Sequence, residues 1–116
     1  MANDFKPTVG GKVLKADAEK WIAKYDKDRL KDKDDTKSVF YGKDFINSIF
    51  AEHPNAAGIS FFLADKPNGN GKDTVQLVLV PTTEDGQLLW NLQDGKDGGG
   101  TAYDSGTICP PFCPKP

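Results

Sequence analysis

Two cysteines close to the C-terminus have the clearest potential for chemistry, in the segment Cys109-Pro-Pro-Phe-Cys113. A redox-active dithiol is commonly Cys-x-x-Cys at a helix N-terminus, where the helix dipole lowers the thiol pKa. Here the spacing has one extra residue, and the two prolines do not suit a helix whose first turn would hold Cys109. Tetrahedral zinc needs three or four ligands, and the chain adds only one histidine, His53, to the two thiols. A local disulfide or a pair of free thiols is our first interpretation, and a thiol-redox or metal-binding role through Cys109 and Cys113 is the alternative.

A disulfide between these cysteines requires a sharp turn. Four fully extended residues span about 13 Å, whereas bridged cysteines have Cα atoms roughly 4.4–6.8 Å apart. Pro110 and Pro111 can supply the turn through a cis peptide bond or a type I or II corner. Because the closed loop is very short, we expect a bridge to fix local shape and to add little to global stability.

Other candidate sites have simpler explanations. His53 could act as a general base, but we interpret it as a helix C-terminal residue that interacts with the helix dipole. Gly10-Gly-Lys12 lacks the upstream glycine and the following Ser or Thr of a phosphate-binding loop, so it predicts a turn. The segment 65–73 looks like a calcium loop, but the ligand spacing fails. Three acidic residues lie near 98–100: Asp94, Asp97 and Asp104. A Gly-rich connector explains them without a bound cation.

Composition and charge exclude several classes of partner. The chain has 116 residues, with 15 Lys and Arg against 17 Asp and Glu, and its net charge is −2. This balance gives no basic surface for a phosphate backbone or an anionic membrane, so we expect neither nucleic acid nor a membrane as a partner. The chain has no secretory signal and no apolar run of about 18–20 residues, so we expect a soluble, cytoplasmic protein, with both thiols reduced in that compartment.

The elements that would position these residues follow from hydrophobic periodicity. Apolar residues at helical spacing predict amphipathic helices over 15–30 and 43–53. Short β-branched and aromatic runs predict strands over 38–41, 58–64, 74–81 and 87–92, with turn residues over 67–72. This order indicates an α+β fold with both helices packed on one face of a small antiparallel meander. We expect large aromatic residues to build the core: Trp21, Phe40, Tyr41, Phe45, Phe50 and Trp90.

The predicted domain organisation is a single domain over 1–116. Residues 1–14 form an N-terminal arm, 15–92 the folded body, and 93–116 an extended tail rich in Gly and Pro. Both faces of the predicted sheet carry apolar residues, so the face without helices needs a cover, either the tail or a second subunit. Three large tail residues are expected to pack on the body, with the cysteines at or near the surface: Tyr103, Ile108 and Phe112.

Several segments together resemble a family of small uncharacterised bacterial proteins that end in a Cys-Pro-Pro-x-Cys tail. The segments that carry the resemblance are Ala18-x-x-Trp21-Ile22-x-x-Tyr25, Phe40-Tyr41-Gly42-Lys43-Asp44, Gly58-Ile59-Ser60-Phe61-Phe62, Leu77-Val78-Leu79-Val80 and Glu84-Asp85-Gly86. The resemblance spans most of the chain and implies a bacterial origin and a shared fold. It implies no activity, cofactor or catalytic residue, since the family carries no assigned activity.

The sequence therefore favours a noncatalytic protein-interaction or structural module over an enzyme. No catalytic constellation is recognisable, and no cofactor is implied. The expected partner is a second copy of the chain, in a homodimer, or an unknown protein.

Overall fold

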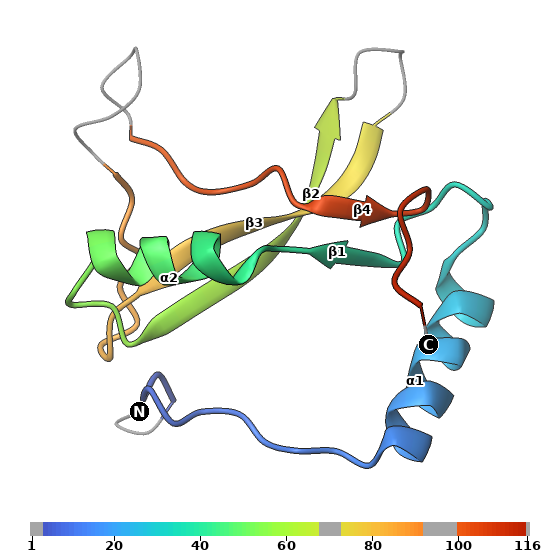
Figure 1. Ribbon diagram of the computed structural model, residues 1–116, viewed down its shortest axis with the longest axis horizontal. Helices are drawn as coiled ribbons and strands as arrows, with labels where there is room; N and C mark the ends of the chain where they lie inside the picture. The colour runs from blue at the N-terminus through green and yellow to red at the C-terminus, as the bar shows by residue number, and fades with distance from the viewer. Residues whose placement is uncertain (1–3, 68–72, 92–99, 116) are drawn as a thin grey trace.

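The computed structural model describes residues 4–67, 73–91 and 100–115, and its elements confirm the predicted α+β class. Both predicted helices are present, and so are the strands predicted over 38–41, 58–64 and 74–81 (Figure 1). In chain order the elements are α1 (Lys15–Arg29), β1 (Ser38–Phe40), α2 (Lys43–Glu52), β2 (Gly58–Pro67), β3 (Asp73–Thr82) and β4 (Thr107–Cys109).

A long antiparallel hairpin of β2 and β3 dominates the fold. Its register places Gly58 opposite Thr82 and Pro67 opposite Asp73. Directly opposed residues of an antiparallel pair lie on the same face, so Phe61 shares a face with Leu79, and Phe62 shares the other face with Val78. The predicted turn between these strands lies outside the described residues for positions 68–72.

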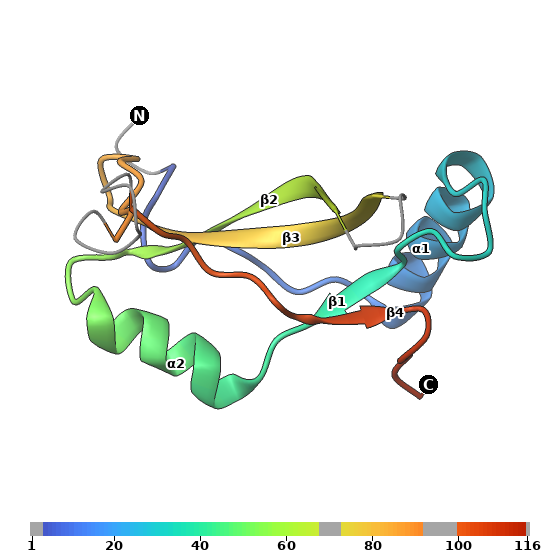
Figure 2. The same ribbon diagram turned by 90° about the horizontal axis from the view of Figure 1, so that it is seen from above.

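A second, two-stranded sheet joins β1 to β4. Ser38 lies opposite Cys109 and Phe40 opposite Thr107, in antiparallel register. Part of the predicted tail is therefore a strand. Figure 2 shows two layers, with the β2–β3 hairpin in one and α2, β1 and β4 in the other.

The buried core is small and lies around α2 and the second half of β3. Ile49 of α2 and three consecutive residues of β3, Leu79 to Pro81, are its largest fully buried side chains. Helix α2 ends as predicted, because His53 precedes Pro54 and adopts a non-helical conformation while its N–H donates to Ile49 O at 3.1 Å. The predicted aromatic core is wrong in most positions, since Tyr41 is half-buried whereas the other five side chains are exposed: Trp21, Phe40, Phe45, Phe50 and Trp90.

The predicted packing of α1 on the sheet is also wrong. The helix forms where expected, and its residues favour helix, with a Lys24–Asp28 ion pair of 2.9 Å one turn apart. None of its residues is buried, however. Figure 1 shows it at the opposite side of the molecule from α2. Periodicity identified its apolar stripe but not what that stripe contacts.

The strand predicted over 87–92 does not form in residues 87–91, and residue 92 lies outside the described part of the chain. A tight turn follows β3, in which Thr83 N–H donates to Gln87 O at 3.0 Å. Only an isolated bridge, Thr82 opposite Leu88, then continues the pairing. The predicted meander is therefore replaced by a hairpin and a separate small sheet.

Candidate functional site

The outer edge of β3 is closed by four residues from three segments of the chain. Leu79 exchanges both backbone hydrogen bonds with Tyr103, so the C-terminal segment extends the sheet at that point. Alternate residues of a strand point their carbonyls to the same side. The carbonyls on this side accept hydrogen bonds from Thr36 Oγ1 at Val75 (2.7 Å), Tyr41 Oη at Leu77 (2.5 Å), Tyr103 N–H at Leu79 (3.1 Å) and Leu89 N–H at Pro81 (2.8 Å).

An aromatic cluster holds α2 against the C-terminal segment. The Tyr41 and Phe45 rings stack with centroids 5.9 Å apart, and Phe45 meets Tyr103 edge-on at 5.8 Å. Burial is the main cause that raises the pKa of Tyr41 above its ordinary value. His53 Nε2 lies 3.1 Å from Tyr103 Oη. This contact gives His53 a structural role as the link between the end of α2 and the C-terminal segment.

The two cysteines form a disulfide, with their Cα atoms 4.6 Å apart. The Cys109-Pro110 and Pro110-Pro111 peptide bonds are both cis, and Phe112 N–H donates to Ile108 O at 3.1 Å across the turn. Cys109 is 5% exposed, whereas Cys113 is exposed. Sulfurs joined in a disulfide are not the thiolates that bind zinc. The expectation that both cysteines lie at or near the surface is wrong for Cys109, which is buried. Within the described residues, no group of three or more His, Cys, Asp or Glu could hold a metal ion.

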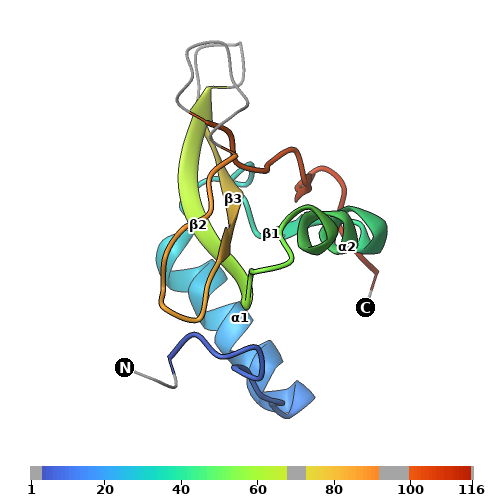
Figure 3. The ribbon, with the colours of Figure 1, turned by 90° about the vertical axis from the view of Figure 1, so that its left-hand side faces the viewer.

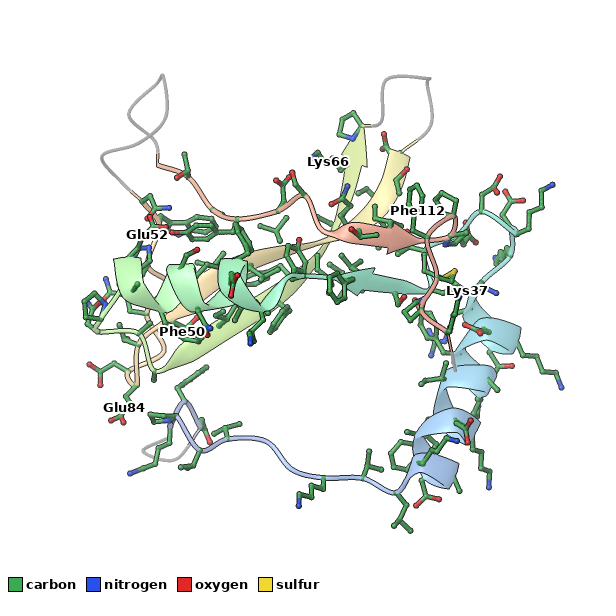
Figure 4. The ribbon with its side chains drawn as sticks, in the orientation of Figure 1. Lys37, Phe50, Glu52, Lys66, Glu84 and Phe112 are labelled. Atoms are coloured by element: carbon green, nitrogen blue, oxygen red, sulfur yellow. A yellow bond between two sulfur atoms is a disulfide. The ribbon has the colours of Figure 1, made fainter. Side chains whose placement is uncertain are left out.

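The three predicted docking residues differ in their surroundings. Tyr103 is half-buried in the aromatic cluster, and Ile108 is half-buried in β4 opposite Val39. Phe112 does not pack on the body, because its side chain is 71% exposed. In Figure 4 it lies on the turn after β4. The short disulfide loop, closed at Cys113, leaves it on the outside of the turn.

A cavity of about 810 Å³ lies between the end of α1, the distal hairpin and the two prolines. Its wall includes Asp65 and Asp73, from the segment that looks like a calcium loop, together with Arg29. Its described wall includes no His or Cys. Of the acidic residues near 98–100, Asp104 binds Lys66 Nζ at 2.7 Å, and the other two lie outside the described residues.

The most unusual feature of the surface is the apolar stripe of α1. We define this stripe by four residues whose side chains are between 48% and 72% exposed: Leu14, Trp21, Ile22 and Tyr25. Residues at intervals of three, four, seven and eight share one side of a helix, so these side chains form one surface. The sequence revealed the stripe, but it gave no signal that Thr36 and Tyr41 would cap β3.

No family model, curated protein or solved structure matches this chain. A search of the described residues finds no helix long and apolar enough to cross a membrane.

Proposed function

We propose that this protein is a noncatalytic protein-interaction module that contacts its partner through the apolar stripe of α1. The observation that carries this proposal is a helix of 15 residues with no buried side chain and a stripe that includes Trp21 and Tyr25. An amphipathic helix normally gains its stability by burying such a stripe.

The size of the stripe supports a functional role. Exposed fractions of 48% to 72% correspond to roughly 500 Å² of uncovered apolar side chain over its four residues. Patches of about 300–600 Å² are the largest on typical monomers and are often functional. Amphipathic helices are recognised by apolar grooves, with anchors about one and two turns apart. A partner with such a groove fits Trp21, Ile22 and Tyr25.

The charges around the stripe favour recognition by shape. Lys20 and Lys24 flank the stripe together with Asp17 and Asp28, so neither sign dominates. Electrostatic steering would therefore be weak. As part of the same proposal, we place the protein in the cytoplasm and relate it to the family of small bacterial proteins that it resembles. In that compartment the disulfide would be reduced for most of the time.

The test compares two matched surface variants of the full chain. Trp21→Lys places a charge in the stripe, and Phe112→Lys places the same charge at another exposed aromatic position, on the turn after β4. The wild-type chain is used for affinity capture from a bacterial extract, and each captured protein is then purified and titrated by calorimetry.

We expect Trp21→Lys to weaken binding by about 30-fold or more, the effect of a typical aromatic hot spot, while Phe112→Lys binds like the wild type. Circular dichroism checks that both variants fold. Equal binding of the wild type and Trp21→Lys to every purified candidate contradicts the proposal.

A further inference from the structure

The rest of the chain contacts the two edges of the β2–β3 hairpin to very different extents. Figure 3 shows β2 on the outer side of β3, away from α2 and β1. Four residues from three other segments close the outer edge of β3. Residues of the N-terminal arm between Asp4 and Val9 share the wall of a small cavity of about 180 Å³ with Gly58 to Ser60, at the start of β2.

The hydrogen-bonding groups at the edge of β2 can be assigned from those of β3. Leu79 turns its N–H and C=O toward Tyr103 and therefore away from β2. Phe61 lies directly opposite Leu79, so it is in a non-hydrogen-bonded pair and turns its own N–H and C=O away from β3. The same holds two residues further on, at Leu63. Within the described residues, no hydrogen bond is made to these outward groups of Phe61 and Leu63.

The side chains on this edge are also uncovered. Phe61 is 51% exposed, Phe62 43% and Leu63 74%. Exposed edge strands are usually protected by charges or proline. In β2 the charged residues and the proline come only after the apolar run, at 65–67. The ion pair with Asp104 also holds the Lys66 side chain inward. Figure 4 shows Lys66 near the distal end of the strand. The segment from Ser60 to Ala64 therefore has an open backbone and an apolar surface.

We infer that β2 pairs with β2 of a second copy, antiparallel and about a two-fold axis at Phe62. In this register Phe62 lies opposite Phe62 of the second copy, Phe61 opposite Leu63, and Ser60 opposite Ala64. Between Ser60 and Ala64 each apolar residue then meets an apolar residue and each small residue meets a small one, whereas Ile59 falls opposite Asp65 of the second copy, where the match ends. The outward groups of Phe61 and Leu63 fall on hydrogen-bonded positions, so four backbone hydrogen bonds join the copies. The hairpins merge into a four-stranded antiparallel sheet.

The self-complementary sequence around Phe62 identifies the occupant as a second copy. An unrelated extended peptide could use the same backbone groups, but only β2 itself provides this match on both sides of one axis. The net charge of −2 gives little repulsion between copies. This inference rests on the proposed function, an interaction module, but it uses β2 and not α1.

The small area of this contact indicates a low affinity between the two copies. The exposed parts of Phe61, Phe62 and Leu63 amount to roughly 600 Å² of side chain for two copies. Stable interfaces usually bury about 1,200–2,000 Å², and smaller ones are weak or transient. The dimer should therefore form reversibly, with a Kd of about 1 μM or weaker.

Sedimentation equilibrium of the full chain tests the dimer from about 1 μM to about 1 mM. We expect concentration-dependent dimerisation for the wild type. Leu63→Lys should weaken it by about tenfold or more, because a charge replaces an apolar contact on both sides of the axis. Phe112→Lys is the matched control, since Phe112 is as exposed as Leu63 and lies on another surface. A wild-type chain that stays monomeric throughout overturns the proposal, whether or not it binds an added peptide.

Cysteine cross-linking tests the register. Opposed residues at the two-fold axis have Cα atoms about 4.5 Å apart, within the range for a disulfide, so Phe62→Cys should link two copies under mild oxidation. In Ala64→Cys the two new thiols would be about 13 Å apart, so this variant should not cross-link. Peptide mapping by mass spectrometry identifies the bonded residues. Equal cross-linking of both variants overturns the register.

Trp21→Lys separates this inference from the proposed function. We expect it to lose the partner of α1 but to dimerise like the wild type. If Trp21→Lys abolishes the dimer while Leu63→Lys preserves it, then α1 joins the copies, and the pairing through β2 is wrong. If no α1 partner is found while Leu63→Lys weakens the dimer, the β2 inference stands and the proposed use of α1 fails.

Discussion

A methyl group added at Gly106 tests how closely the C-terminal segment packs on β1. A Cβ atom there would lie 2.5 Å from Val39 Cγ1 and 2.7 Å from Tyr41 Cε2, well inside van der Waals contact. The Tyr41 ring has little freedom to withdraw, because its hydroxyl donates to Leu77 O at 2.5 Å and its ring stacks on Phe45. Gly106→Ala should therefore cost about 1–3 kcal/mol of unfolding free energy, as overpacking usually does.

For a domain of 116 residues, this loss corresponds to a fall in Tm of roughly 4–12 °C. Urea unfolding and thermal melting measure the change. Gly58→Ala is the control, because a Cβ at Gly58 meets nothing within 4 Å. Adding Val39→Ala to Gly106→Ala should recover part of the stability by removing the nearest group. If Gly106→Ala is as stable as Gly58→Ala, this account of the packing is wrong.

Three further changes probe single contacts. Tyr41→Phe removes the donor to Leu77 O and should lower the unfolding free energy by about 1–2 kcal/mol in urea titrations, and an unchanged midpoint would contradict this. The hydrogen bond from Lys66 is the main cause that lowers the pKa of Asp104. The stabilisation by this pair is therefore complete above the unfolded pKa of about 3.9 and is lost as the pH falls through the lower folded value. Because both side chains are 40% exposed, it should be under about 1 kcal/mol, and Asp104→Asn should flatten the pH dependence of stability below about pH 4. Cys113→Ser opens a five-residue loop, which costs at most about 2 kcal/mol in the chain-entropy model, so Tm should fall by at most about 8 °C; loss of folding would refute this.

Local sequence signals were sufficient for the elements with strong internal patterns. Helix α2 could be predicted from the spacing of Phe45, Ile46 and Ile49 and from the stop at His53-Pro54. The hairpin could be predicted from two β-branched and aromatic runs around a turn-rich segment. The tight closure of the disulfide loop was also anticipated, since its geometry depends only on five consecutive residues.

Pairings between distant segments could not be predicted in the same way. The β1–β4 sheet joins Ser38 to Cys109, and neither short strand has a pattern that identifies the other. Trp21 and Trp90 were assigned to the core because large aromatic residues are usually buried. Their exposure depends on where α1 and the segment after β3 lie in space, which periodicity does not determine.

The direction of the backbone groups in β3 explains why the sheet has one open edge. The apolar pattern predicts that the C-terminal segment or a second subunit covers a face of the sheet, whereas the C-terminal segment bonds to the edge of β3 at Leu79. The neighbouring outward carbonyls of β3 are occupied by Thr36, Tyr41 and Leu89. A further strand therefore cannot join β3 without displacing these segments. A further strand can instead join the sheet at β2, because the open backbone groups and the exposed apolar side chains lie together there.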